Sequence, residues 1–556
     1  MAKRVLVVGG VAGGASAAAR LRRLDETAEI LLFDRGPHVS FANCGLPYYV
    51  GDVIRDEGKL LVASRALFRD RFAIDVFTEH EAVEVDRAAK VLRVKDLRTG
   101  ETRDERYDAL VLSPGAAPIR PTAPGIDLPG VFVVRTIPDA NRIRAWIQED
   151  KCKTAVVVGG GFIGLEMAEN LTFRGLAVTV LEKLPQVMPP IDPEMAATVS
   201  THLRDKGVTL RMGEGFTAIE AVDGRLGVVT DLGNRVDTDL VILALGVRPE
   251  VGLARAAGLA LGARGGIVVD EHMRSSDPSI YAVGDVIEVR DVVSGQETIL
   301  PLAGPANRQG RVAAESIAAR PTRFRGVQGT AIVEVLGLSV ATTGASEKGL
   351  RRAGVTDFDV VYLHPGHHAG YYPGAKPIHL KLIFSKTTGK ILGAQAVGMD
   401  GVDKRIDVIA TMIQLGGTVH DLAEAELCYA PQFGAAKDPA NIAGMMGENA
   451  LCGDMPLADW SQVGDTDAML LDVRDPHEFA AGHIDGAVNI PLPELRRRAA
   501  EVPTDRPVWV YCAAGQRAYF AQRMLLQKGV DAHNLSGGFT TWTARVQAGL
   551  NGAPKA

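Results

Sequence analysis

Cysteine is scarce in this sequence. There are only five among 556 residues, and they are scattered at positions 44, 152, 428, 452 and 512. A sparse, odd number of cysteines argues against a framework of structural disulfides and favours a reducing compartment. We therefore expect the thiols to be free.

Long apolar runs and an excess of positive charge are also missing. No stretch is long and apolar enough to span a membrane, and a net charge of −6 argues against a nucleic-acid-binding surface. Lys3 and Arg4 precede apolar residues, as in a signal peptide, but the run 5–8 is short and ends in glycines. The N-terminus therefore predicts a strand, a turn and a helix, and we expect a cytoplasmic protein.

Glycine, by contrast, is abundant, with 61 residues in a chain long enough for three to four domains. Gly9, Gly13 and Gly14 follow a predicted buried strand and precede a predicted helix, 15–24. This is the pattern of a dinucleotide-binding turn, in which the helix N-terminus faces a pyrophosphate and an acidic residue, here Asp34, faces a ribose hydroxyl. Because the second glycine of the usual pattern is replaced by valine, a generic strand–helix unit is the alternative.

A second turn of the same kind matches the full G-x-G-x-x-G pattern at Gly159, Gly161 and Gly164. Two such units in one chain predict a flavin dinucleotide at one and a nicotinamide dinucleotide at the other. Glu182 ends the strand after the second turn and would repel the 2′-phosphate of NADPH. Lys183 beside it leaves the preference between NADH and NADPH open.

Cys44 lies in a stretch of small and polar residues, S-F-A-N-C-G-L-P-Y-Y, from residue 40 to residue 49. A thiolate that attacks a disulfide or persulfide forms a mixed disulfide, so one thiol suffices if the other sulfur arrives with the substrate. Ser40 and Asn43 are predicted to cap a following turn, and a helix N-terminus lowers the pKa of a thiol. A buried structural cysteine is the alternative.

The same stretch resembles the active-site segment of coenzyme A-disulfide reductases. These are single-cysteine members of the pyridine nucleotide-disulfide oxidoreductase family, to which NADH oxidases and peroxidases also belong. Related disulfide-reducing flavoenzymes carry a second cysteine where this chain has Tyr49. The resemblance extends to about residue 447 and implies FAD at the first turn and Glu166 near the nicotinamide. It also implies a coenzyme A site formed by Ser16, Arg20, Arg23, Ser40 and Asn43, and it places Asn307 near the coenzyme A or the flavin; Arg71 is a further candidate for this site. The two helix arginines are equally explained as cations at a helix C-terminus.

Further segments extend this resemblance. Residues 107–118, with Gly115, and residues 279–285, which end in Gly284 and Asp285, are similar to the family's other FAD-binding motifs. Residues 329–447 resemble its dimerisation domain, which implies a homodimer. The tyrosines of that domain that reach the partner's reactive cysteine match Tyr371 and Tyr429, for which packing is the alternative. A histidine cluster at residues 364, 367 and 368 lacks the ligands that would complete a zinc site, so we expect no metal.

The C-terminal part closely resembles a single rhodanese domain, from L-L-D-V-R-D at residue 470 to C-A-A-G-Q-R at residue 512. Cys512 follows a predicted strand, 508–511, and precedes a helix. Backbone N–H groups in such a loop stabilise a thiolate or persulfide anion, and Arg517 adds positive charge. A catalytically inactive relative of this fold normally lacks the cysteine.

These patterns predict an α/β chain with two Rossmann-like FAD- and NAD(P)-binding domains, an α+β dimerisation domain and a C-terminal α/β rhodanese domain. The boundaries are 1–150 with 275–325 (FAD), 151–274 (NAD(P)H), 326–447 (dimerisation), 448–464 (linker) and 465–556 (rhodanese). The predicted activity is FAD-dependent reduction of coenzyme A disulfide, coenzyme A persulfide or polysulfide by NADH or NADPH. The alternatives are an NADH oxidase or peroxidase with a cysteine sulfenic acid, and a sulfur carrier or redox sensor of low turnover.

Overall fold

The computed structural model describes residues 2–148 and 152–550 and contains two compact units. Unit 1 comprises Met1–Lys183 and Glu214–Val327, and unit 2 comprises Leu184–Gly213 and Gln328–Ala556. The predicted boundary at 150–151 and the last predicted rhodanese residues, 551–556, lie outside the described residues. No helix of the described ranges has the length and apolar character needed to cross a membrane.

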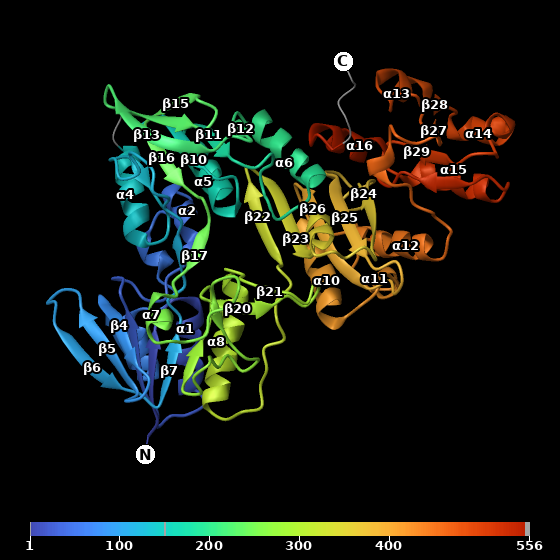
Figure 1. The fold of residues 1–556 in the computed structure, drawn as a ribbon. Coiled ribbons are helices and arrows are strands. Elements are labelled where there is room, and N and C mark those ends of the chain that lie inside the picture. Colours follow the sequence, from blue (N-terminus) through green and yellow to red (C-terminus); the bar gives the residue numbers. More distant parts are fainter. Residues whose placement is uncertain (1, 149–151, 551–556) are drawn as a thin grey trace. The chain divides into compact units, whose positions relative to one another are not determined.

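Unit 1 contains a parallel sheet of order β19-β7-β1-β2-β3 (Figure 1). Strands β19, β7 and β1 are almost wholly buried. Helices α1 and α8 pack together beside it. The first helix begins at Ala12, inside the glycine turn and earlier than predicted. The bounds are β1 Arg4–Val8, α1 Ala12–Arg22, β2 Glu29–Asp34, α3 Arg65–Phe72, β3 Asp75–Thr78, β7 Ala109–Leu112, β19 Ile280–Ala282 and α8 Ala303–Ile317.

A second parallel sheet of unit 1 contains strands in the order β11-β10-β16-β9. Its bounds are β9 Val131–Phe132, α4 Ile137–Gln148, β10 Thr154–Val158, α5 Phe162–Phe173, β11 Ala177–Glu182 and β16 Leu240–Leu243. Smaller antiparallel elements complete the unit: β4 His80–Asp86, β5 Val91–Asp96, β6 Thr102–Arg106, β8 Ala116–Pro118, β13 Phe216–Val222, β14 Arg225–Thr230, β15 Arg235–Thr238 and β17 Val247–Pro249. The short remainder is η2 Glu57–Leu60, α7 Gly252–Ala256, β18 Ile267–Val268, β20 Ile287–Arg290 and β21 Glu297–Thr298.

Unit 2 contains an antiparallel sheet of order β22-β23-β26-β25-β24, so β24 is an edge strand. Its bounds are α6 Pro193–Asp205, β12 Thr209–Met212, β22 Ala331–Val335, β23 Leu338–Gly344, α9 Glu347–Arg352, β24 Asp359–Leu363, β25 Ile378–Phe384, β26 Ile391–Gly398, α10 Val402–Leu415, α11 Val419–Ala423 and α12 Pro439–Leu451. Helix α6 belongs to this unit although it falls within the predicted NAD(P)H-binding range, because it packs on β23 and β26.

The C-terminal part of unit 2 is a four-stranded parallel sheet of order β28-β27-β29-β30. Its bounds are η3 Trp460–Gln462, β27 Met469–Asp472, α13 Pro476–Ala481, β28 Val488–Asn489, α14 Leu492–Arg498, η4 Ala499–Glu501, β29 Val508–Tyr511, α15 Gln516–Leu526, β30 Ala532–Asn534 and α16 Gly538–Gln547.

The predicted linker, 448–464, is not a free tether within this unit. Helix α12 continues to Leu451, and Met455 and Trp460 are buried. Leu457 forms a β-bridge with Asn534, the last residue of β30. The polar composition that suggested a linker therefore belongs to a segment with defined contacts.

Candidate active sites

The two dinucleotide-binding turns of unit 1 have the same geometry. Gly10 N–H donates to the Asp34 carboxylate at 2.8 Å, and Gly160 N–H donates to the Glu182 carboxylate at 2.7 Å. In both strand–turn–helix segments, the acidic residue at the end of the second strand thus lies beside the glycine turn. Burial raises the pKa of Asp34, and hydrogen bonds from Gly10 and Gly36 oppose that rise.

Gly14 and Gly164, one glycine in each turn, are required by close backbone approach. A Cβ on Gly14 would lie 1.9 Å from the carbonyl oxygen of Gly9, and a Cβ on Gly164 would lie 1.9 Å from that of Gly159. At Gly161 a Cβ would meet no atom within 4 Å. The first two positions therefore close the strand–helix turn, whereas Gly161 leaves the turn open where a dinucleotide would pass.

Arg135 provides a test of whether the first turn fits a bound anion. Within the described residues its Nη1 is buried without a hydrogen-bond partner. Its Nη2 donates to the carbonyl oxygen of Pro114 at 3.2 Å and forms an ion pair with Glu250 at 2.9 Å. Burial lowers its pKa, and Glu250, Asp285 and Asp34 oppose this effect. A half-buried guanidinium with a buried, unused donor near both predicted FAD-binding acids fits an anionic dinucleotide.

The other predicted FAD-binding residues lie in the loops that follow β7 and β19 of the same sheet. Gly115 has φ 76° and Gly284 has φ 84°, a region that glycine adopts without strain. Gly284 N–H donates to the side chain of Gln309 on α8 at 2.8 Å. Asp285 follows β19, and burial raises its pKa. These residues converge on the carboxyl ends of β7 and β19.

Cys44 is exposed and lies in a short 3-10 turn, η1 Asn43–Gly45, which leads directly into α2 Leu46–Val50. The predicted capping was wrong: Ala42 precedes the turn and Gly45 precedes the helix, and neither element has a side-chain cap. Ser40 instead adopts φ 49°, and its backbone bonds to Gly10, Val62 and Ala63. The thiol is therefore presented by backbone geometry and by the packing of α2 on α4 and α5.

Glu166 contacts the helix that follows Cys44. Tyr48, on α2, donates from its hydroxyl to Glu166 Oε1 at 3.3 Å. Burial raises the pKa of Glu166 from 4.5 to about 7; the hydrogen bond from Tyr48 lowers it and Glu169 raises it further. A carboxyl group of this kind exchanges a proton near neutral pH.

We expect Glu166→Gln to raise the thermal unfolding midpoint increasingly from about pH 5 to pH 8. The carboxyl ionises near pH 4.5 when unfolded but near pH 7 when folded, so its contribution to stability falls as pH rises through this window. The full difference corresponds to at most about 3 kcal/mol. The exposed Glu101→Gln is the matched control, and a wild-type-to-variant difference that does not change with pH would contradict the assignment.

The predicted coenzyme A residues are divided between existing pairs and exposed positions. Ser16 donates to Asn307 on α8 at 2.5 Å, which brings these two predicted residues together. Arg20 is ion-paired with Glu315 of α8 at 2.5 Å, so contact with a phosphate would require it to leave this partner. Arg23 caps the C-terminus of α1 and Arg71 lies in the last turn of α3, and both are exposed.

Tyr371 and Tyr429 are brought together by unit 2 although they are far apart in sequence. Their hydroxyls are hydrogen-bonded at 2.7 Å, and their exposed fractions are 76% and 49%. The hydrogen bond to Tyr429 raises the pKa of Tyr371. The two linked phenols therefore lie on an exposed surface and not in a packed core.

Cys512 lies in the loop between β29 and α15 and is 2% exposed. Gly515 N–H donates to its Sγ at 3.1 Å, as predicted for an anion-stabilising loop. Arg517 forms a bidentate ion pair with Glu478, at 2.6 and 2.7 Å. This pair lowers the pKa of Glu478 to about 2, so the charge of Arg517 is largely balanced by a residue that the sequence did not single out.

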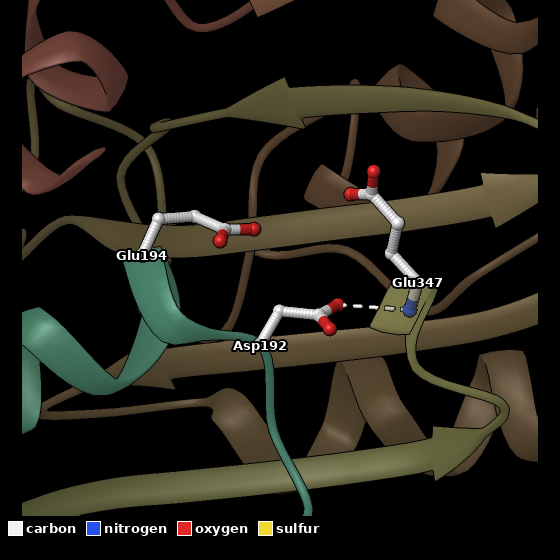
Figure 2. Close-up of side chains that lie close together, drawn as sticks. All are labelled: Asp192, Glu194 and Glu347. Carbon is white, nitrogen blue, oxygen red and sulfur yellow. Dashed lines mark hydrogen bonds between the residues drawn. The ribbon is translucent and has the colours of Figure 1, made fainter. Parts of the chain in front are cut away.

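Three carboxylates of unit 2 converge as metal ligands would: Asp192, Glu194 and Glu347 (Figure 2). The Lys381 ammonium lies 2.8, 2.5 and 2.8 Å from Asp192, Glu194 and Glu347, respectively. It therefore occupies the position that a metal ion would take. Burial alone would lower the pKa of Lys381, but these carboxylates hold it well above its usual value. Of the three predicted loop histidines, His364 is paired with His379 at 2.8 Å.

Profiles of known families match most of the chain. Residues 3–310 match the pyridine nucleotide-disulphide oxidoreductase profile, 330–440 match the dimerisation domain of the same family, and 457–545 match the rhodanese-like domain. The coenzyme A disulfide reductase of Staphylococcus epidermidis is 35% identical over 443 residues, which are 79% of this chain and 99% of that protein.

Two solved structures are similar over almost the full length. Reduced CoADR-RHD from Bacillus anthracis is 48% identical, with a TM-score of 0.96 and 98% of both chains covered. The NAD-dependent persulfide reductase from A. fulgidus is 38% identical, with a TM-score of 0.90, covering 97% of this chain and 100% of the other.

Paired dinucleotide-binding turns on parallel sheets define a flavin- and nicotinamide-dependent oxidoreductase. The profile match covers more than half of the sequence. The chain belongs to the pyridine nucleotide-disulphide oxidoreductase family and carries a rhodanese-like domain after its dimerisation domain.

Proposed function

We propose that this enzyme uses NAD(P)H to reduce coenzyme A disulfide, coenzyme A persulfide or polysulfide at Cys44, and that Cys512 carries sulfane sulfur. The observation that carries the proposal is an exposed Cys44 followed by Tyr49 where related disulfide reductases have a second cysteine. The partner sulfur must then come from the substrate. The similarity to CoADR-RHD and to a persulfide reductase, which both extend through the rhodanese-like domain, supports it.

The chemistry at Cys44 balances without an internal disulfide. Its thiolate attacks one sulfur of coenzyme A disulfide, forms a mixed disulfide and releases the first coenzyme A thiolate. Two electrons from NAD(P)H and a proton then cleave the mixed disulfide, which returns the Cys44 thiolate and the second coenzyme A thiol. Bound FAD supplies the electron transfer between nicotinamide and sulfur.

The residues proposed to hold each group follow from the site geometry. FAD would bind at Gly9, Gly13, Gly14, Asp34, Gly115, Gly284 and Asp285, with Arg135 in addition. The nicotinamide dinucleotide would bind at Gly159, Gly161, Gly164, Glu166 and Glu182. Because Glu182 repels a 2′-phosphate, NADH should be used at least as well as NADPH. Coenzyme A would bind at Ser16, Arg23, Ser40, Asn43, Arg71 and Asn307, with Arg20 available only after it leaves Glu315.

A substrate panel under anaerobic conditions tests the proposal: coenzyme A disulfide, coenzyme A persulfide, polysulfide, peroxide and, separately, oxygen. We expect stoichiometric thiol release from coenzyme A disulfide, with matching NADH consumption and no oxygen uptake. Faster NADH turnover with oxygen or peroxide would instead assign the enzyme as an oxidase or peroxidase. A failure to turn over with any acceptor would favour a carrier or sensor.

The proposed homodimer would use Tyr371 and Tyr429 as proton donors to sulfur leaving Cys44 of the opposite subunit. Replacing both by phenylalanine is expected to slow coenzyme A disulfide reduction on the order of 100-fold, the usual size of a general-acid effect. Flavin reduction by NADH should be nearly unchanged. Rapid-mixing measurement of both half-reactions separates these effects, and equal losses would mean that the tyrosines are structural. Tyr372→Phe, at the neighbouring tyrosine, is the matched control.

A further inference from the structure

The edge strand of the dimerisation sheet is bonded directly to the rhodanese-like domain. Tyr362, on β24, donates its backbone N–H to the Ser536 hydroxyl at 2.8 Å, and that hydroxyl donates back to the Tyr362 carbonyl oxygen at 3.2 Å. Both residues are buried. One serine thus satisfies both outward backbone groups of an edge-strand residue, which would otherwise be open to unspecific pairing.

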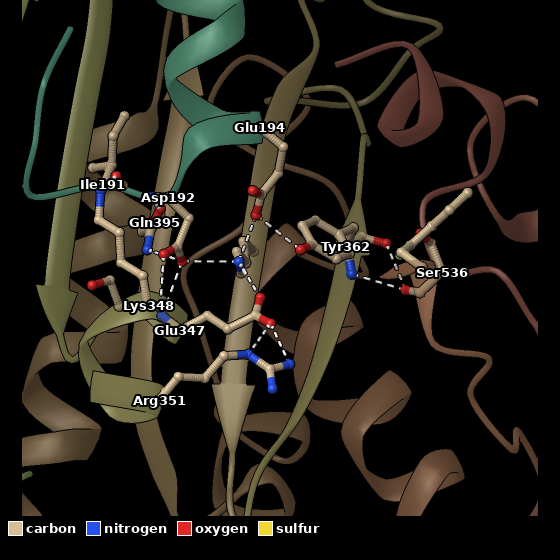
Figure 3. A network of polar contacts seen from close by, with 12 residues as sticks. Ile191, Asp192, Glu194, Glu347, Lys348, Arg351, Tyr362, Gln395 and Ser536 are labelled. Atoms are coloured by element: carbon tan, nitrogen blue, oxygen red, sulfur yellow. Dashed lines mark hydrogen bonds and ion pairs between the residues drawn. The ribbon is translucent and has the colours of Figure 1, made fainter. Parts of the chain in front are cut away.

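Tyr362 is also fixed from its other end, as Figure 3 shows. Its hydroxyl donates to Glu194 at 2.9 Å, and Glu194 is held by the Lys381 ammonium at 2.5 Å. The ring belongs to a buried aromatic cluster that includes Trp460 and Tyr511 of the rhodanese-like part. The side chain is therefore a rigid anchor for the residues that pack against it.

The loop that begins at Ser536 lies between Tyr362 and the Cys512 loop, and its backbone at Gly537 is close to both. A Cβ on Gly537 would lie 2.7 Å from Tyr362 Cβ and 3.0 Å from His364 Nε2. A Cβ on Gly515, which donates to the Cys512 sulfur, would lie 3.4 Å from the nitrogen of Gly537. Tyr362 and His364 therefore pack closely on Gly537, which in turn lies beside the Gly515 turn of the Cys512 loop.

The first turn of α16 connects the same elements by hydrogen bonds. Phe539 N–H donates to the carbonyl oxygen of Cys512 at 2.7 Å, and Thr540 N–H donates to that of Ala513 at 3.0 Å. Thr541 is bonded through Oγ1 to His364 Nε2 at 3.0 Å. Burial lowers the pKa of His364 to about 3, with His379 adding to the effect, so the imidazole is neutral at working pH.

We propose that Tyr362, His364 and Ser536 are positioning residues of the Cys512 sulfur-transfer site, so that the docked dimerisation sheet forms part of this site. The inference rests on the proposed sulfur-transfer role of Cys512. Backbone N–H groups stabilise the sulfur anion only while their directions are held. A displacement of about 1 Å at such a site costs up to about 100-fold in rate.

Full-length His364→Ala and Ser536→Ala test the proposal, with transfer of sulfur from thiosulfate to cyanide as the assay. We expect kcat to fall about tenfold in each variant with KM nearly unchanged, because the site is misaligned and substrate contacts are retained. His364→Gln, which can still bond Thr541, should recover most of the loss. The rate of iodoacetamide alkylation at Cys512, followed by peptide mass spectrometry, should differ from wild type in the same variants that lose kcat.

His367→Ala is the matched control, because His367 bonds to Lys376 within the dimerisation domain. Coenzyme A disulfide reduction should be the same in all these variants. Rates in His364→Ala and Ser536→Ala within twofold of wild type, or an equal loss in His367→Ala, would overturn the inference. If one variant does not fold, the other still decides. A wild-type enzyme without Cys512-dependent transfer would refute the proposed function, whereas the alkylation rates would still test the positioning.

Discussion

Cys44→Ser is expected to abolish reduction of coenzyme A disulfide while FAD stays bound. A serine hydroxyl does not form the mixed disulfide, and loss of a covalent nucleophile lowers kcat on the order of 1,000-fold or more. Cys44 lies in the 3-10 turn η1, whereas the glycines and acids proposed to bind FAD lie at or just after the ends of strands β1, β2, β7 and β19. Turnover with coenzyme A disulfide, together with the flavin absorbance of the purified variant, measures both effects.

The matched control for this experiment is Cys452→Ser. Cys452 is also exposed, and its thiol donates to the carbonyl oxygen of Asn449, three residues earlier, at 3.7 Å. It should leave turnover unchanged. A Cys44→Ser enzyme with turnover within tenfold of wild type would refute the assignment, and loss of FAD from this variant would show that the change is not confined to sulfur chemistry.

Cys512→Ser is expected to have the complementary effect. Sulfur transfer from thiosulfate should fall on the order of 1,000-fold, because the persulfide forms on this sulfur. Coenzyme A disulfide is a soluble substrate for Cys44, so its reduction should persist. Both activities should be assayed in both cysteine variants under identical conditions. Full sulfur transfer by Cys512→Ser, or loss of disulfide reduction with FAD retained, would show that the two thiols do not divide the work in this way.

Reduction of coenzyme A persulfide by Cys512→Ser distinguishes two routes for sulfur. Unchanged reduction would indicate that coenzyme A persulfide reaches Cys44 by diffusion. Reduced turnover would indicate that Cys512 relays sulfur directly. Cys452→Ser serves again as the control.

Local patterns in the sequence sufficed for much of the fold. The predicted strand 508–511 coincides with β29, and the predicted N-terminal strand 5–8 lies within β1. The pairs Gly10–Asp34 and Gly160–Glu182 also follow from the strand–turn–helix pattern, since each acid ends the neighbouring strand. Short-range periodicity and turn chemistry determine such features.

Contacts between distant segments were beyond the reach of these patterns. Tyr48 and Glu166 are brought together only by the packing of α2 on α5, and Arg20 is paired with a residue of α8. The buried Lys381 looks like an ordinary strand residue in the sequence. Its importance depends on three carboxylates at the starts of α6 and α9, one of them on the residue just before α6. Spacing along one element carries no information on such pairings.

The shared anchor at β24 has a consequence for protein engineering. A chimera in which the rhodanese-like domain is exchanged from residue 457 onward would place a foreign loop against Tyr362, where even a methyl group on Gly537 would lie 2.7 Å from the Tyr362 Cβ. A graft that also transplants β24 and His364 would keep both sides of this contact native. A rhodanese-like domain that is to be transferred therefore needs more than the residues matched by the family profile, and strand 359–363 should be transferred together with it.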